Sequence, residues 1–221
     1  MRSAVVQLKE VAVGGNVTSW RRLGLQIEDS RGLASGVAID IHDDQEGLLS
    51  CSFSHDQTAD NQSGFDEIDG LPIRWHDHFR SRPLPAFELS STFDGVDFIG
   101  IDHIVITTDD LDRTSDAIEN VLGVSRARTR DAGHSVTQAF HKLDNTILEL
   151  VTGPHVKHLG AKWWGFVLTV NDIDHWWKQV GESVATPPRD AVQQGRKIST
   201  IHSSVGLDVA VAVMSPHIRT N

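Results

Sequence analysis

The sequence predicts an α+β fold built from repeated βαβββ modules. Residues 101–154 and 163–216 each open with an apolar strand, continue as an amphipathic helix and close with an apolar strand. An offset of 62 positions places Asp109 on Asn171 and Pro154 on Pro216. The repeat decides the fold, because each copy is one supersecondary unit whose apolar face needs a neighbour to cover it.

Length and composition are those of an ordinary globular protein. The 221 residues are 39% hydrophobic and 23% charged, which suffices for a buried core. The apolar runs are strand-length, far below the roughly 20 residues that span a bilayer, so we expect no membrane partner. Lys9 and Glu10 interrupt the first apolar run too early for a signal peptide. The single cysteine, Cys51, excludes an internal disulfide, and the cytoplasm is the expected location.

Negative charge is concentrated in one segment. The chain has a net charge of −10, and residues 28–70 hold eleven acidic residues and one basic residue. No basic stripe remains that could release counterions, so nucleic acid is not an expected partner. The acidic segment lacks the ligand spacing of an EF-hand loop, and we interpret it as a solvated face.

Residues 1–98 are expected to form a degenerate N-terminal βαβββ-like module followed by a long connection. Strand-like runs (VVQLKEVAV, GVAIDI, GLLSCSF) flank a short helix, VTSWRRLG, in the order of the later copies. Residues 56–99 are rich in Pro, Ser, Asp and Gly, and we interpret them as the connection, with room for one strand. An irregular segment of that length is uncommon in a compact protein.

Residues 99–221 are expected to form one domain of two modules, residues 100–154 and 161–216. In the first, Asp109 or Asp110 can cap the helix, and Gly123 ends it. In the second, Asn171 or Asp172 can cap, and Gly181 ends the helix. Each helix is followed by strand-like runs, so both modules fit a βαβββ order.

Three stretches carry a family resemblance. They are IDHIVITTDDLDRT at 101–114, KLDNTILELVTGP at 142–154 and DAVQQGRKISTIH at 190–202. The arrangement resembles the vicinal oxygen chelate superfamily of glyoxalase I, extradiol dioxygenases and bleomycin resistance proteins, and the third stretch is similar to uncharacterised bacterial members. The resemblance implies that the paired modules curl into a cup of mixed sheet. It also implies a divalent metal, held by one residue from the first and one from the last strand of each module.

His103 and Glu149 occupy the two implied ligand positions of the first copy. Strand alternation places His103 on one face and Asp102 on the other, and the first face is expected to carry Ile101, His103, Val105 and Thr107. A carboxylate at Glu149, between apolar neighbours, needs a partner, so the two side chains can meet across the sheet. Their nitrogen and oxygen suit Zn, Ni, Mn or Fe, and resemblance to glyoxalase I gives Glu149 the further role of catalytic base.

The second copy lacks both donors. The offset of 62 puts Gly165 where His103 stands and Val211 where Glu149 stands. Two protein ligands are fewer than the three of a catalytic zinc site. The alternative is a hydrogen-bonded His103–Glu149 pair that lines a metal-free cavity.

Several other residues are candidates for the site, each with a plainer structural alternative. His141 and His202 lie in later strands and could complete a site around Glu149. Trp163 could wall the space left by Gly165 or pack in the core. The remaining candidates are Arg196 with Lys197, as anion-binding residues at the rim or exposed turn residues, and His76 with His78, as ligands or loop residues.

Three functional hypotheses follow. The first is a glyoxalase-like protein that binds a small organic molecule in the cup, with metal-dependent lyase or isomerase activity. The second is a metal-free sequestering protein of the bleomycin-resistance type. The third is a scaffold that has lost its site and associates with a partner. Because members of this fold pair modules across subunits, a homodimer is a further expectation.

Overall fold

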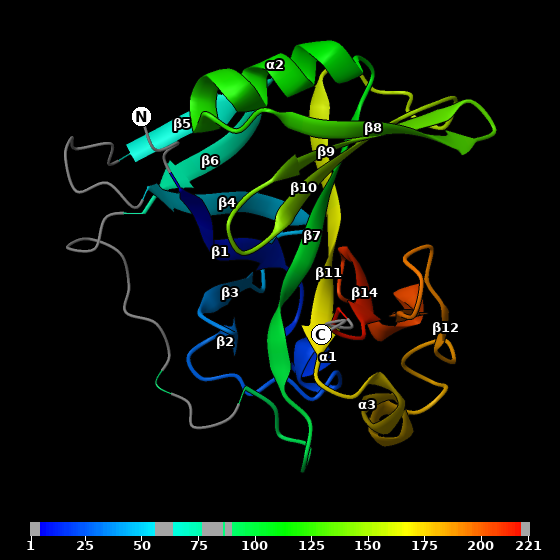
Figure 1. Cartoon of the computed structure of the whole chain (residues 1–221). Coiled ribbons are helices and arrows are strands. Elements are labelled where there is room, and N and C mark those ends of the chain that lie inside the picture. The colour runs from blue at the N-terminus through cyan, green and yellow to red at the C-terminus, as the bar shows by residue number, and fades with distance from the viewer. Residues whose placement is uncertain (1–4, 56–63, 77–85, 87–89, 218–221) are drawn as a thin grey trace.

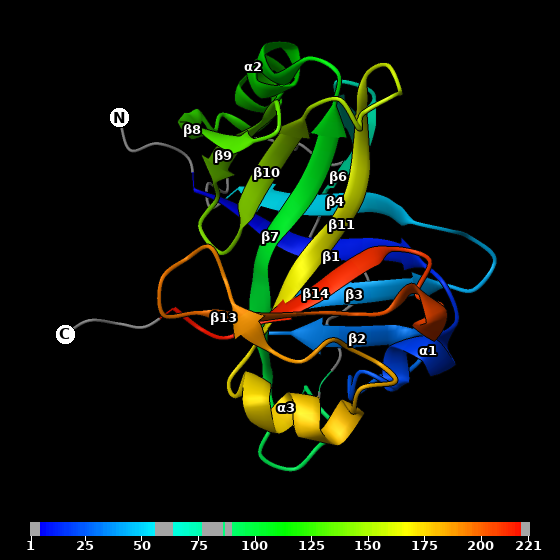
Figure 2. The same cartoon turned by 90° about the vertical axis from the view of Figure 1, so that its right-hand side faces the viewer.

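The chain forms two mixed sheets in the computed structural model, which describes residues 5–55, 64–76, 86 and 90–217. The predicted pair of His76 and His78 falls partly outside these residues, since His78 is not among them. One sheet has six strands and the other has eight. Figures 1 and 2 show the smaller sheet lying against one side of the larger. No helix in the described ranges is long and apolar enough to cross a membrane.

The eight-stranded sheet joins two βαβββ modules, as predicted. Its strand order is β12-β13-β14-β11-β7-β10-β9-β8. In each module the last strand pairs in parallel with the first, β10 with β7 and β14 with β11, while β7 and β11 pair antiparallel at the centre. The elements are β7 Phe98–Thr108, α2 Leu111–Leu122, β8 Arg126–Gly133, β9 Val136–Lys142, β10 Ile147–Thr152, β11 Ala161–Val170, α3 Ile173–Val180, β12 Arg189–Asp190, β13 Lys197–Thr200, the 3-10 turn η1 Ser203–Val205 and β14 Ala210–Met214.

The two long helices begin and end through local sequence chemistry. The Asp110 side chain accepts hydrogen bonds from the backbone N–H groups of Asp112 and Arg113, which caps α2. Gly123 ends α2 in the left-handed conformation, at φ 68°. Asp172 caps α3 by accepting from the His175 N–H. Of the alternatives left open by the sequence, the structure therefore selects the second residue of each pair.

The N-terminal sheet repeats the same plan in shortened form. Its order is β2-β3-β1-β4-β6-β5, with β1 parallel to β3, β4 parallel to β6, and β1 antiparallel to β4 at the centre. The region therefore resembles two reduced modules, whereas the sequence suggested one. Its elements are β1 Val6–Gly14, α1 Val17–Arg21, β2 Arg31–Ala34, β3 Val37–His42, β4 Leu48–His55, β5 Gly64–Ile68 and β6 Leu71–Trp75.

Strands β5 and β6 lie in the segment interpreted as a connection. They are joined by a two-residue turn, in which Asp69 and Gly70 have φ values of 50° and 83°. An Asp-Gly pair between apolar residues is a strong hairpin signal. The division of the chain into domains at residues 1–98 and 99–221 stays a proposal.

The N-terminal sheet covers the helix-bearing side of the larger sheet. Trp20 of α1 stacks on Phe166 of β11, with ring centroids 6.1 Å apart. The indole N–H of Trp176 in α3 donates to the Leu23 carbonyl at 2.8 Å. Because this side holds the shared core, we call it the core face of the eight-stranded sheet. The opposite side, which carries Val105 and Val167, is called the open face.

A turn of the larger sheet binds the edge of β1. The Asn145 side chain accepts from the Leu8 N–H and donates to the Leu8 carbonyl, both at 2.9 Å. The Asp144 N–H donates to the Val6 carbonyl. These bonds satisfy backbone groups of β1 at a point where β3 does not pair with it, and they tie the two sheets together.

Candidate functional site

Strand register places His103 and Glu149 on the open face. His103 of β7 lies opposite Ile147 of β10 and Val167 of β11. Val105 lies opposite Glu149. Residues that pair in register point to the same face of the sheet. His103 and Glu149 lie in two neighbouring rows of paired residues on that face, so their side chains come together.

A β-bulge changes the predicted faces of β7. Ile104 pairs with Phe166 and Ile101 pairs with Leu168, so one residue of β7 is left over at Asp102. Phe166 and Leu168 both face the core, and Ile101 does so as well. The expectation that Ile101 shares the face of His103 is therefore wrong. A bulge inserts one unpaired residue and inverts the alternation beyond it.

The bulge brings Asp102 against its neighbour His103. Oδ2 of Asp102 lies 2.8 Å from Nδ1 of His103. Because a carboxylate only accepts, Nδ1 carries the proton and donates it to this bond. Nε2 then faces Glu149, whose Oε2 lies 3.5 Å away. The histidine is thus oriented by one carboxylate and presents its second nitrogen to another.

Glu149 is buried within a short hydrogen-bonded chain. The Gln138 side-chain amide donates to Oε1 of Glu149 at 2.5 Å, and Arg130 donates in turn to the Gln138 oxygen through Nε at 2.9 Å and through Nη2. Burial raises the pKa of Glu149, although the nearby charges of His103 and Arg130 act in the opposite direction. A carboxyl group with a raised pKa holds its proton to a higher pH than a solvent-exposed glutamate does.

Arg196 neutralises Asp102 on the other side of His103. Its Nη2 lies 2.6 Å from Oδ1 of Asp102, and its Nε donates to the Ser215 carbonyl at 2.8 Å. Burial alone would raise the pKa of Asp102, but the hydrogen bonds from His103 and Arg196 and the charge of Arg196 lower it to about 2. Arg196 is itself 2% exposed. It therefore holds an internal carboxylate and does not lie at a solvent-exposed rim.

The structure places the other predicted site residues away from this cluster. Trp163 pairs with Ile106 and faces the core, because a second bulge falls at Trp164. His141 lies on the core face, where its Nδ1–H donates to the Val124 carbonyl and its Nε2 accepts from Ser115. His202 donates to the Glu182 carbonyl. For Trp163 the structure therefore selects core packing, the second alternative, and His141 does not join a site around Glu149.

Comparison with known proteins identifies the C-terminal region. Residues 100–198 match the family model described as Glyoxalase/Bleomycin resistance protein/Dioxygenase superfamily. This region is a domain of that superfamily. A search of curated proteins found no match.

Solved structures with a similar arrangement include two epimerases and one hypothetical protein. The methylmalonyl-CoA epimerase from Mycobacterium tuberculosis is 16% identical, with 54% of this chain and 89% of that chain covered and a TM-score of 0.44. A methylmalonyl-CoA epimerase in complex with methylmalonyl-CoA and NH4+ is 18% identical, with coverages of 55% and 96% and a TM-score of 0.46. The hypothetical protein from Bacillus halodurans is 13% identical, with coverages of 58% and 99% and a TM-score of 0.46.

The glyoxalase-superfamily domain does not offer the donor set of a catalytic metal. By register, Ala212 pairs with Val167 as Glu149 pairs with Val105. The counterpart of Glu149 is therefore Ala212 and not Val211 as predicted, and Gly165 remains the counterpart of His103. In the described part of the chain, no three His, Cys, Asp or Glu side chains are grouped to hold a metal ion. Two donors are fewer than the three protein ligands usual at a catalytic metal. The described residues therefore do not form a catalytic metal site.

The space expected at Gly165 is filled by the neighbouring strand. A Cβ atom built on Gly165 would lie 2.1 Å from the Ala210 carbonyl oxygen and 2.8 Å from the Ala210 Cβ. The glycine thus permits β11 and β14 to approach closely. It leaves no room there for a ligand.

The N-terminal sheet carries acidic residues at equivalent positions. Glu10 and Asp40 have the same register relation across β1 and β3 as His103 and Glu149 have across β7 and β10. The buried guanidinium of Arg31 forms ion pairs with both acids. Both acids are thus engaged by a buried guanidinium of the protein itself, and for this reason the pair on the eight-stranded sheet is the better candidate site.

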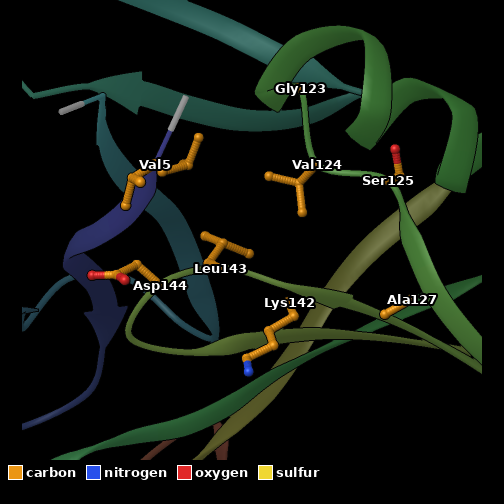
Figure 3. Close-up of a pocket in the computed structure, with 9 residues that line it drawn as sticks. Val5, Gly123, Val124, Ser125, Ala127, Lys142, Leu143 and Asp144 are labelled. Atoms are coloured by element: carbon orange, nitrogen blue, oxygen red, sulfur yellow. The ribbon is translucent and has the colours of Figure 1, made fainter. Parts of the chain in front are cut away.

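One cavity of about 420 Å³ lies elsewhere, at the junction of β1, α2, β8 and the β9–β10 turn. Figure 3 shows Val5, Val124 and Leu143 directed toward one another there. None of its lining residues belongs to the cluster around His103 and Glu149. The chemistry of the site therefore lies on the open face and not in this cavity.

Asp102, Gln138 and Arg130 were missed by sequence reasoning. Alternation along β9 groups Gln138 with Phe140, but only the pairing of β9 with β10 brings Gln138 to Glu149. Asp102 was assigned to the wrong face because a bulge has no clear sequence signal. Its position directly before His103 was the available clue.

Proposed function

We propose that the protein binds a small organic molecule on the open face, with His103 and Glu149 as its polar anchor. The observation that carries the proposal is a buried carboxyl group of raised pKa directed at a histidine. A buried ionisable group with a shifted pKa and a specific polar partner is a candidate for a functional site. Membership of the superfamily at residues 100–198 supports the same choice of face.

The pair offers a ligand hydrogen-bonding groups from two neighbouring side chains. With Nδ1–H bound to Asp102, Nε2 is the His103 ring nitrogen left for a ligand, and the Glu149 carboxyl group lies beside it. Their separation of 3.5 Å exceeds a good hydrogen bond. A ligand hydroxyl group placed between them can donate to one of the two groups and accept from the other when that group carries a proton, which replaces this weak contact with two hydrogen bonds.

Glu149 is the proposed catalytic residue if the ligand is also a substrate. Its raised pKa suits it to take a proton from a carbon next to a carbonyl group and to return it, the chemistry of an isomerase or lyase. His103, oriented by Asp102, would accept a hydrogen bond at Nε2 from a hydroxyl group of the ligand. The alternative is a sequestering protein that binds the same class of molecule without turnover.

Binding can be tested by NMR on the full chain with a library of small organic fragments. We expect ligands to shift the backbone amide signals of residues 103–105, 147–149 and 165–167. The variants His103→Ala and Glu149→Gln are expected to weaken binding, while Glu182→Gln, at an exposed site, serves as the matched control. Shifts confined to the cavity lined by Val124 and Leu143 would overturn the proposal.

Metal content separates this proposal from the metal-dependent alternative. We expect protein purified without chelator to hold substoichiometric metal, and Zn²⁺, Ni²⁺, Mn²⁺ or Fe²⁺ to leave its melting temperature unchanged. Stoichiometric metal, lost in both His103→Ala and Glu149→Ala, would instead favour a metal-dependent lyase or isomerase. The cytoplasmic location and the homodimer stay predictions.

A further inference from the structure

We propose that the ligand of the open face is a small organic molecule that carries a negative charge. The inference rests on the proposed function and narrows the chemical class of its ligand. It follows from the distribution of charged side chains across the eight-stranded sheet, which the register of the strands assigns to one face or the other.

Basic side chains share the open face with the His103–Glu149 pair. Arg128 lies opposite Phe140, in the row of Glu149, and Lys142 lies opposite Ile147, in the row of His103. Three more basic residues share this face by register. The five are Arg128, Arg130, Lys142, Lys162 and Arg189.

Acidic side chains on the same face are few and already compensated. In the described strands of the sheet they are Asp102 and Glu149. Asp102 is paired with Arg196 at 2.6 Å, and Glu149 accepts a hydrogen bond from Gln138, which Arg130 holds. The described strands therefore place more basic than acidic side chains on the open face, in a chain whose net charge is −10. Such local reversal of charge concentrates anions at a site.

The centre of the face limits the size and type of the anion. Phe140, Val105 and Val167 lie beside the polar pair, and Val105 and Val167 are nearly buried. Arg128 and Arg130 lie over the Phe140 ring, at 4.5 and 6.0 Å from its centroid. A molecule with a short apolar part and one anionic group matches this surface. A polyanion such as nucleic acid needs a longer basic track.

The test uses matched pairs of probes on the full chain. Benzoate, phenylacetate and butyrate are each compared with the corresponding primary amide by NMR titration of the open-face amide signals. We expect each acid to bind at least about five-fold more tightly than its amide, and the difference to shrink as KCl rises from about 0.05 to about 0.3 M. Circular dichroism checks that each variant is folded.

Variants that remove positive charges test whether the open face causes the preference for acids over amides. The double variant Arg128→Gln/Lys162→Gln, whose two residues do not line the cavity at Val124 and Leu143, is expected to weaken the acids about three-fold or more and to leave the amides unchanged. Lys178→Gln on α3, exposed on the helix side, removes a charge elsewhere and is expected to change neither. These two results together support the proposal.

Failure of this inference and failure of the proposed function would give different results. Acids and amides that bind equally to the open face overturn this inference and leave the proposed function standing. The inference also fails if acids bind the double variant as tightly as the wild type, or if a short single-stranded DNA displaces them. If no probe shifts any open-face signal, the proposed function fails with it.

Discussion

Asp102 and Arg196 form a buried ion pair, with Oδ1 and Nη2 2.6 Å apart. Arg196→Met leaves the Asp102 charge buried without this partner. Breaking a buried pair in this way costs about 3–5 kcal/mol, and urea unfolding measures the loss. The matched control is Lys197→Met at the next residue, whose pair with Asp174 is exposed and is expected to contribute little to stability. Equal effects of the two substitutions would contradict the role given to Arg196.

The lowered pKa of Asp102 also predicts that the free energy of unfolding depends on pH. Its pKa is about 2 in the folded chain, below the ordinary value of 3.8. The folded state therefore releases this proton more readily, and the stabilisation is complete above pH 4 and is lost as pH falls toward 2. The shift corresponds to about 2 kcal/mol. Asp102→Asn is expected to lack this part of the pH dependence, and parallel curves for both proteins between pH 5 and pH 2 would refute the assignment.

Glu149 is expected to change the stability with pH in the direction opposite to Asp102. Because burial raises its pKa, the folded chain holds this proton more tightly than the unfolded chain. Stability should decline as pH rises from the unfolded pKa through the folded one. Glu149→Gln keeps a partner for Gln138, so we expect its free energy of unfolding at pH 7 to be unchanged or higher, with ligand binding lost. A clear destabilisation by this change would show that Glu149 serves the fold and not the site.

The core of the candidate site was predictable from the sequence. The repeat indicated paired modules, and apolar alternation around Glu149 placed it with His103 on one face. Strong periodic patterns of this kind depend on short-range geometry alone.

The faces and contacts of the other site residues could not be predicted, because they depend on how the strands pair. Bulges at Asp102 and Trp164 reverse the face of Ile101 and of Trp163. One extra residue before the last strand moves the counterpart of Glu149 from Val211 to Ala212. Neither feature changes hydropathy enough to be visible in the sequence. Arg196 was expected at a rim because its burial arises from Asp102, which is distant in the chain.

The contact between Asn145 and Leu8 predicts how the two sheets are coupled. Asn145→Ala removes both partners of the Leu8 backbone groups, and we expect a loss of about 1–3 kcal/mol. Hydrogen exchange of residues 6–9 should accelerate more than that of residues 103–106. Gln194→Ala, at an exposed loop site, is the control and should change neither quantity. Uniform acceleration across both sheets would show that the turn does not act locally.

Gly165 gives the sharpest steric prediction. A Cβ there would meet the Ala210 backbone at 2.1 Å, so Gly165→Ala must push β11 and β14 apart at the centre of the sheet. We expect a loss of about 3 kcal/mol or more, whereas Ala212→Ser, on the half-exposed open face of β14, should change stability by about 0.5 kcal/mol or less. Thermal and urea unfolding compare the two variants. If Gly165→Ala were as stable as the wild type, there would be room for a side chain at the position equivalent to His103, and the conclusion that β14 fills this space would be wrong.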